Sequence, residues 1–297
     1  MSLEDIKIIR KVKVNDKEYE CDDYRPIVDQ FAPEILKLIN PQSKEDRLIQ
    51  ERFLSRLLTV HQVIDITGNF TTTSKEITFF DILFDAIENN ISAQELLKFI
   101  NNCIKEIILA IPHDLKNKIK NIIYDMIVNF NEKESCFYSR VAELACLKEV
   151  LKNGKLKIID IENKLLNGKS VDMVISYNNG DCFIDVLSMR ITEGKIQSGD
   201  DMYKILLHRI ANKYEDKFQG LSNQHLKDCG IMPVLWGDLI EFKQYKNALE
   251  KLSSDYKNQV IHPHGLVYCP QKEYKFTSIK NITDKIRKNR VQNDTIF

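Results

Sequence analysis

Two aspartates flank a strong turn signal in the second half of the chain. Asp172 and Asp185 lie on either side of Asn178-Asn179-Gly180, and an Asn-Gly pair between apolar segments predicts a tight β-hairpin. If the last two of these residues form the turn, Asp172 pairs with Leu187 and Val174 pairs with Asp185. The two carboxylates then share one face as diagonal neighbours, with about 7 Å between their backbones.

Two acids at this spacing repel each other unless a metal ion or a basic side chain lies between them. Carboxylate oxygens are also the ligands that Mg²⁺ and Mn²⁺ prefer in proteins. A shared face for Asp172 and Asp185 therefore predicts a divalent-metal site on the hairpin.

The pattern around the hairpin predicts the elements that position it. Nine of the ten glycines follow residue 150, which is typical of strands and turns rather than helices. We expect helices over residues 135–153, 200–220 and 239–252, and strands over 156–161, 171–177, 182–190, 231–236 and 265–269. The predicted order in this half is therefore αβββαβαβ.

The first half has a different pattern. Residues 6–21 alternate between apolar and charged side chains and predict a small β-hairpin. From residue 24 to about residue 130 the apolar side chains follow helical spacing, most clearly over 117–130. We therefore expect a mixed fold with two domains. Residues 1–133 form a mostly helical domain with a small β-hairpin, and residues 134–297 form an α/β domain with a basic C-terminal tail.

Composition limits the classes of function. Lysine plus arginine and aspartate plus glutamate both number 43, so no overall positive field attracts nucleic acid, and any such partner needs a local basic patch. The seven cysteines form no close pairs, which indicates reduced thiols rather than a disulfide framework or a zinc knuckle. No segment is apolar enough to span a membrane, and the first ten residues do not read as a signal peptide. We expect a cytoplasmic protein without a membrane partner.

Other arrangements that could carry chemistry are weaker. His262-Pro263-His264 places two imidazoles at i and i+2, but a third metal ligand at sensible spacing is missing, and a loop that enters a strand is the preferred interpretation. The sequence has no Gly-rich phosphate loop and no recognisable nucleophile-base arrangement, which disfavours kinases, nucleotide-dependent switches and serine hydrolases.

The residues around the two aspartates resemble the PD-(D/E)XK nuclease superfamily. The resemblance rests on a glutamate in Arg-Val-Ala-Glu-Leu-Ala (Glu143), an aspartate in Val-Asp-Met-Val (Asp172), a hairpin, and an acid in Phe-Ile-Asp-Val-Leu (Asp185). The predicted order αβββαβ matches the restriction-endonuclease-like core of that superfamily. The resemblance covers residues 135–236 and implies nothing about the helical half.

This resemblance implies a catalytic role for these acids. Asp172 and Asp185 would hold one or two Mg²⁺ or Mn²⁺ ions, the carbonyl of Val186 could add a ligand, and Glu143 would complete or orient the set. Such an ion polarises the scissile phosphate and activates the attacking water. The sequence departs from the family pattern at two positions, because Val171 replaces the usual proline and Leu187 replaces the usual lysine.

The missing lysine leaves alternatives open. Some members of the superfamily carry this cation on the following helix, where Lys213 and Lys217 lie one turn apart, whereas Arg190 has the wrong parity to share the face of Asp185. The resemblance then implies a metal-dependent nuclease with a helical recognition, regulatory or dimerisation module, as in bacterial restriction and defence. Otherwise the nuclease fold is inactive and serves as a binding module for protein or nucleic acid. A third hypothesis is that the helical half is a protein-interaction module and the α/β half is only its scaffold.

If nucleic acid is the partner, two basic patches are candidates for its phosphates. One includes Lys204 and Arg209 with the two lysines of the same predicted helix. The other includes Lys285, Arg287 and Lys288 near the C-terminus, although a basic helix face is more often simply solvated. The resemblance favours DNA over RNA and allows a homodimer.

Overall fold

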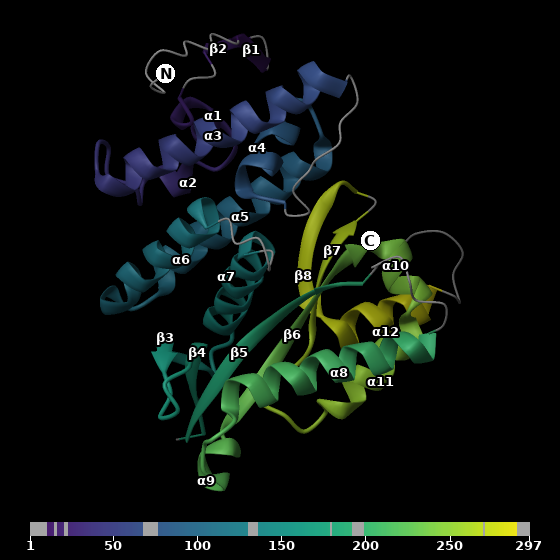
Figure 1. Cartoon of the computed structure of the whole chain (residues 1–297). Coiled ribbons are helices and arrows are strands. Elements are labelled where there is room, and N and C mark those ends of the chain that lie inside the picture. Colours follow the sequence, from purple (N-terminus) through teal and green to yellow (C-terminus); the bar gives the residue numbers. More distant parts are fainter. Residues whose placement is uncertain are drawn as a thin grey trace. The chain divides into compact units, whose positions relative to one another are not determined.

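The computed structural model describes residues 11–14, 17–20, 23–67, 77–129, 136–178, 180–191, 199–269 and 271–289. By its internal contacts the chain divides into two compact units (Figure 1). The first contains Met1–Glu106 and Ile119–Val141, and the second contains Ile107–Lys118 and Ala142–Phe297. The predicted boundary between residues 133 and 134 lies inside the first unit, a short distance before this division.

The first unit is mostly helical, as predicted. It contains β1 (Lys11–Val14), β2 (Lys17–Glu20), α1 (Arg25–Phe31), α2 (Pro33–Leu36), α3 (Lys44–Thr67), α4 (Phe79–Ile87) and most of α5 (Ile91–Ala110) and α6 (Lys116–Val128). The predicted N-terminal hairpin is confirmed where it is described, because β1 and β2 pair in antiparallel register from Lys11↔Glu20 to Val14↔Lys17. Residues 6–10 of that prediction lie outside the described residues.

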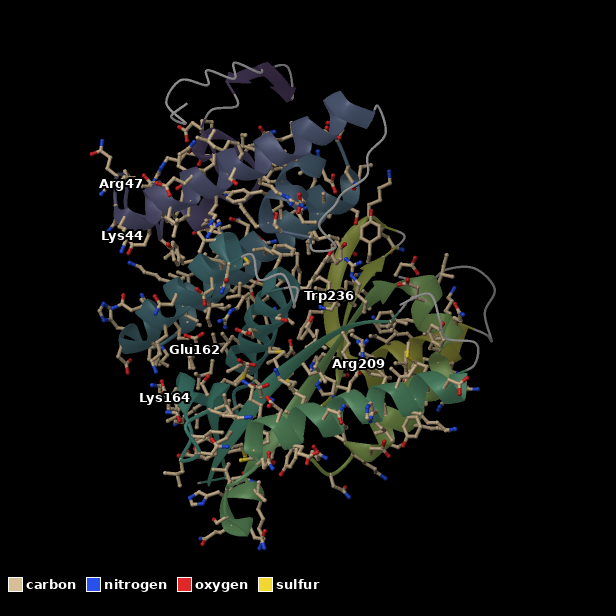
Figure 2. All side chains as sticks on the ribbon, in the orientation of Figure 1. Lys44, Arg47, Glu162, Lys164, Arg209 and Trp236 are labelled. Atoms are coloured by element: carbon tan, nitrogen blue, oxygen red, sulfur yellow. The ribbon has the colours of Figure 1, made fainter. Side chains whose placement is uncertain are left out.

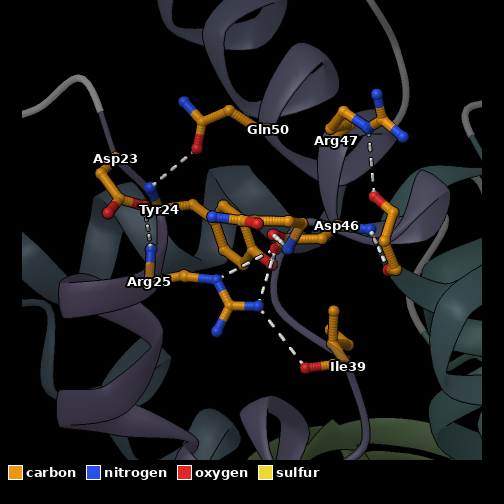
Figure 3. Close-up of polar contacts among 9 residues, drawn as sticks. Asp23, Tyr24, Arg25, Ile39, Asp46, Arg47 and Gln50 are labelled. Atoms are coloured by element: carbon orange, nitrogen blue, oxygen red, sulfur yellow. Dashed lines mark hydrogen bonds and ion pairs between the residues drawn. The ribbon is translucent and has the colours of Figure 1, made fainter.

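One carboxylate joins the first turns of two helices in this unit (Figure 3). Asp46 of α3 accepts hydrogen bonds from the Tyr24 hydroxyl at 2.5 Å, the Gln42 amide at 2.7 Å and the Arg25 guanidinium at 2.8 Å. Arg25 opens α1, so this contact ties α1 to α3. These hydrogen bonds, together with the positive charge of Arg25, lower the pKa of Asp46.

The second unit is built on a six-stranded mixed sheet with the order β3-β4-β5-β6-β7-β8. Its elements after the shared helix α7 (Cys136–Lys152) are β3 (Lys157–Lys164), β4 (Ser170–Tyr177), β5 (Gly180–Arg190), α8 (Gly199–Phe218), α9 (Asn223–Leu226), β6 (Cys229–Asp238), α10 (Leu239–Gln244), α11 (Lys246–Asp255), β7 (His264–Cys269), β8 (Glu273–Ser278) and α12 (Ile279–Asn289). Strands β3, β4 and β5 are antiparallel, β5, β6 and β7 are parallel, and β8 is antiparallel to β7.

The predicted order of helices and strands from residue 135 to residue 269 is confirmed by this arrangement. The structure adds the short helix α9, the edge strand β8, in which every side chain is half-buried, and the helix α12 in the predicted basic tail. The single helix predicted over 239–252 is divided into α10 and α11. Helices α8 and α11 lie side by side along the sheet (Figure 1). Within the described residues, no helix combines the length and the apolar character needed to cross a bilayer.

An apolar cluster joins the sheet to its covering helices. Met189 of β5, Leu206 of α8 and Leu249 of α11 belong to one buried cluster that also includes residues of β6, β7, α10 and α12. Gly265 of β7 permits the close approach of two of these helices. A Cβ atom there would lie 2.5 Å from Ile282 of α12 and 2.8 Å from Phe242 of α10, so any side chain would force them apart.

His264 opens β7 and is buried. Its Nδ1 lies 2.8 Å from the His262 carbonyl, and its ring stacks on Phe276 with 4.8 Å between ring centroids. His262 and His264 therefore lie where a loop enters a strand, which was the preferred interpretation of the sequence. Burial lowers the pKa of His264 from 6.5 to about 4.

We expect His264 to make the protein sensitive to acid. Between pH 6.5 and pH 4 the unfolded chain binds a proton on this imidazole that the folded protein does not bind, so the free energy of unfolding falls as the pH falls through this window. Chemical denaturation from pH 7 to pH 4 should show a smaller loss for His264→Gln than for the native protein. His208→Gln, at an exposed position, should keep the native slope. Parallel curves for all three proteins would contradict this assignment.

Candidate functional site

The β4–β5 hairpin places the two aspartates directly opposite each other. Tyr177 pairs with Gly180 and Met173 pairs with Ile184, so continuing this register by one residue brings Asp172 opposite Asp185. The predicted pairing of Asp172 with Leu187 is therefore wrong, because the partner of Asp172 lies two residues earlier on β5. A shift of two residues leaves each side chain on the same face of the sheet, so the prediction that Asp172, Asp185 and Leu187 share a face is unaffected.

Asp172 is half-buried, and its carboxyl group holds its proton more tightly than that of an ordinary aspartate. Its Oδ2 accepts a hydrogen bond of 2.6 Å from the Val186 amide. Burial and the negative charge of Asp185 raise its pKa from 3.8 to about 7, against the opposing effects of that amide and of Lys217 and Lys213. The carboxyl group therefore changes its charge near neutral pH.

Asp185 is enclosed by two lysines of α8. The Lys217 ammonium lies 2.8 Å from Oδ1, and the Lys213 ammonium lies 3.0 Å from Oδ2. The Asp185 side chain has an exposed fraction of 0%, compared with 19% for Lys217 and 31% for Lys213. A carboxylate so far from water must be paired, and each of its oxygens has its own cation.

The C-terminal end of α8 is tied to the turn between β3 and β4. The Asn167 amide donates to the carbonyls of Lys217 at 2.9 Å and Gln219 at 3.0 Å, which are acceptors that the end of a helix leaves unpaired. The Lys169 ammonium forms an ion pair of 2.7 Å with Asp216. These contacts fix the last turn of α8, and with it Lys217, whose ammonium also donates to the Ser170 carbonyl of β4 at 2.8 Å.

These anchoring residues were missed in the sequence. The Asn167-Gly168 pair signals a turn, and Gly168 has a φ of 82° that suits glycine, but nothing local indicates that the turn contacts a helix some fifty residues later. By contrast, the predicted cations Lys213 and Lys217 do reach Asp185, which places a positive charge next to the two acids despite Leu187.

The structure does not bring Glu143 into the predicted acid set. Glu143 lies on α7 with an exposed fraction of 6%, whereas the two aspartates come from the hairpin. Within the described ranges, no group of three or more His, Cys, Asp or Glu side chains is arranged to hold a metal ion.

Leu187 has a structural role where the family pattern has lysine. Its half-buried side chain packs against the apolar clusters that contain Met189 and Phe218, with Ile210 and Tyr214 of α8 nearby. Its backbone lies opposite Ser170 when the hairpin register is continued. A lysine there would lose this packing and add a third cation beside Lys213 and Lys217.

The predicted nucleic-acid-binding residues are on two helices. Lys204 is exposed on α8, and Arg209 is half-buried on the same helix (Figure 2). Lys285 and Lys288 are exposed on α12, and Arg287 pairs with Glu250 at 2.8 Å. Lys213 and Lys217 form ion pairs with Asp185, so only part of their positive charge is left for a patch with Lys204 and Arg209.

Comparison with known proteins provides no relative for this arrangement. No family model, no curated protein and no solved structure matches the chain. The interpretation of the site therefore rests on its own geometry and chemistry.

We expect the ion pairs of Asp185 to be a major contribution to stability. Asp185→Asn leaves two partly buried ammonium groups without their anion, and breaking a buried pair in this way costs about 3–5 kcal/mol in the free energy of unfolding. Asp216→Asn breaks the exposed pair with Lys169 and should cost less than about 1 kcal/mol. Urea unfolding of both variants at pH 7.5 measures the difference. If both variants lose the same free energy of unfolding, the ion pairs of Asp185 contribute no more to stability than an exposed pair does.

We also expect Asp172 to oppose stability as the pH rises. Between pH 3.8 and about pH 7 the folded protein retains a proton that the unfolded chain has lost, so the free energy of unfolding decreases with rising pH in this window. Asp172→Asn should remove this decrease and be more stable than the native protein at pH 8, measured by thermal unfolding with a chelator present. Asp181→Asn, on the exposed start of β5, should behave like the native protein. A native-like pH slope in Asp172→Asn would refute the assignment.

Proposed function

We propose that the second unit is a metal-dependent phosphodiesterase of the PD-(D/E)XK type that acts on nucleic acid. The observation that carries this proposal is the pairing of Asp185 with Lys213 and Lys217 directly opposite Asp172. These two lysines would provide from α8 the positive charge that the superfamily usually has on the strand, at the position of Leu187. The order from α7 to β6 also resembles the restriction-endonuclease-like core, which supports the same proposal.

The donor set fits a magnesium ion. Mg²⁺ is commonly bound through one or two carboxylates, with waters and substrate phosphates filling the remaining positions. Asp172 and Asp185 would provide those carboxylates, and the Val186 carbonyl is a candidate third oxygen. The ion would supply Lewis-acid activation of the phosphate and of the attacking water. Because the ammonium groups already neutralise Asp185, we expect the affinity for Mg²⁺ to be weak.

The two lysines are suited to different tasks. Lys217 is the less exposed and also donates to the Ser170 carbonyl, so it is held in place between α8 and β4. Lys213 is more exposed, and its ammonium could turn from Asp185 toward a phosphate as negative charge develops there.

One observation favours a second candidate function, an inactive nuclease fold that only binds. Both oxygens of Asp185 are shielded from solvent, so a metal ion can reach them only if an ammonium group moves away. If that movement does not occur, the same ion pairs act only as structural contacts. Cleavage assays on the native protein decide between the two candidates.

We expect Mg²⁺- or Mn²⁺-dependent cleavage of DNA or RNA by the native protein. Lys213→Ala should abolish cleavage and lower the melting temperature, because one oxygen of the buried Asp185 carboxylate loses its cation. Lys217→Ala should abolish cleavage and lower the melting temperature further, because it also removes the contact with Ser170. The assay is gel analysis of single- and double-stranded substrates, with a thermal melt of each variant.

The matched control is Lys227→Ala, an exposed lysine that is not an ion-pair partner of Asp185, which should cleave like the native protein. Asp172→Asn should fold and lose both metal-dependent cleavage and calorimetric heat of metal binding. If the folded native protein binds nucleic acid but cuts neither DNA nor RNA with either metal, the nuclease proposal fails and the binding module remains.

A further inference from the structure

A polar pocket of about 530 Å³ lies in the second unit between α11 and α12. Pockets for small ligands commonly have volumes of roughly 300–1,000 Å³, so this one is large enough for a compact ligand. None of its lining residues belongs to the Asp172 and Asp185 site.

One wall of the pocket is a single face of α11 and its C-terminal end. Glu250, Ser253, Ser254 and Lys257 line it, and their spacing of three, one and three residues places them on one side of a helix. This wall offers two hydroxyl groups, one carboxylate and one ammonium. Lys257 is exposed, so its ammonium is accessible to a ligand.

The opposite wall repeats the same spacing on α12. Lys280, Thr283, Asp284 and Arg287 line it. Lys280 lies in the first turn of this helix, where partial positive charge from the backbone also favours an anion. Ser278 caps the helix by accepting a hydrogen bond from the Asn281 amide at 3.3 Å, and its hydroxyl lines the pocket.

The charges of the pocket favour an anionic ligand. The carboxylate of Glu250 is already neutralised by Arg287 at 2.8 Å and by Lys246, outside the pocket, at 3.4 Å. Lys257 and Lys280 bring two more positive charges against the single remaining carboxylate, Asp284. The imidazole of His262 also lines the pocket.

The remaining groups indicate what accompanies the anion. Among the described residues that line the pocket, the His262 ring is the one aromatic group, so they offer little surface for stacking a base. Several hydroxyl groups and the carboxylate of Asp284 are suited to the hydroxyl groups of a sugar, because a carboxylate accepts their protons. Phosphate with an adjoining sugar is the chemistry that uses both features.

We propose that this pocket binds the sugar-phosphate group of a phosphorylated ligand, with Lys257 and Lys280 on the phosphate and Asp284 on the sugar hydroxyls. A free nucleotide and the phosphorylated end of a nucleic-acid strand carry the same chemistry. This proposal does not depend on catalysis at Asp172 and Asp185.

Calorimetry at fixed ionic strength, with a chelator present to exclude metal-mediated binding, tests the proposal. The probes are inorganic phosphate, adenosine 5′-monophosphate, adenosine, and a short DNA strand with either a 5′-phosphate or a 5′-hydroxyl end. The pocket variant is Lys257→Ala with Lys280→Ala. The charge-matched control is Lys155→Ala with Lys227→Ala, two exposed lysines that do not line the pocket.

We expect the native protein to bind a phosphorylated probe at least about tenfold more tightly than the pocket variant does, while the control variant retains native affinity. Preference for the mononucleotide identifies a free ligand, and preference for the 5′-phosphorylated strand identifies a strand end. The proposal is overturned if no phosphorylated probe binds, if adenosine binds as tightly as its monophosphate, or if the pocket and control variants lose affinity equally. A thermal melt confirms that each variant is folded.

Discussion

The ion pairs between Asp185 and the two lysines of α8 constrain the whole second unit. A carboxylate with no exposure to water cannot remain charged in an apolar interior without paired cations. Lys213 and Lys217 meet that requirement only if α8 lies across β5 in one position along its axis. The turn between β3 and β4 holds the last turn of α8 in that position through Asn167.

The same ion pairs affect how the hairpin can bind a metal ion. They bring two acids and two cations together with no net charge when all four are ionised, which reduces the attraction for a further cation. A divalent ion must therefore compete with groups that belong to the protein. Access of an ion to Asp185 then depends on how readily one ammonium group leaves it, and the greater exposure of Lys213 makes that lysine the better candidate to move.

Much of this architecture could be predicted from local patterns. Alternating apolar residues and the Asn-Gly pair predicted the hairpin and the shared face of its aspartates. The predicted register was wrong because Tyr177 pairs with Gly180, which starts the turn at Asn178, one residue earlier than predicted. Asn178 has a φ of 50°, a backbone conformation that asparagine adopts more readily than most residues. Strand β8 was missed although Tyr274 and Phe276 alternate with Glu273 and Lys275, which is the pattern of a short strand.

Contacts between distant elements could not be predicted in the same way. The approach of Lys213 and Lys217 to Asp185 was offered only through a family resemblance, because no periodicity fixes how a helix is placed on a sheet. Glu143 shows the opposite outcome, since a motif suggested a shared acid set that the described structure does not form. The anchoring role of Asn167 likewise depends on a contact between segments that are far apart in sequence.

The two edges of the mixed sheet have a consequence for self-association. An edge strand presents unpaired backbone groups that can template the addition of a strand from another molecule. On β3, the Lys118 ammonium donates to the Ile161 carbonyl at 2.8 Å, and the strand is irregular between Ile158 and Asp160. On β8, Glu273 and Lys275 place a charge pair along the edge. Both edges are therefore poor templates for intermolecular strand pairing, which protects a sheet of six strands from aggregation without closing it into a barrel.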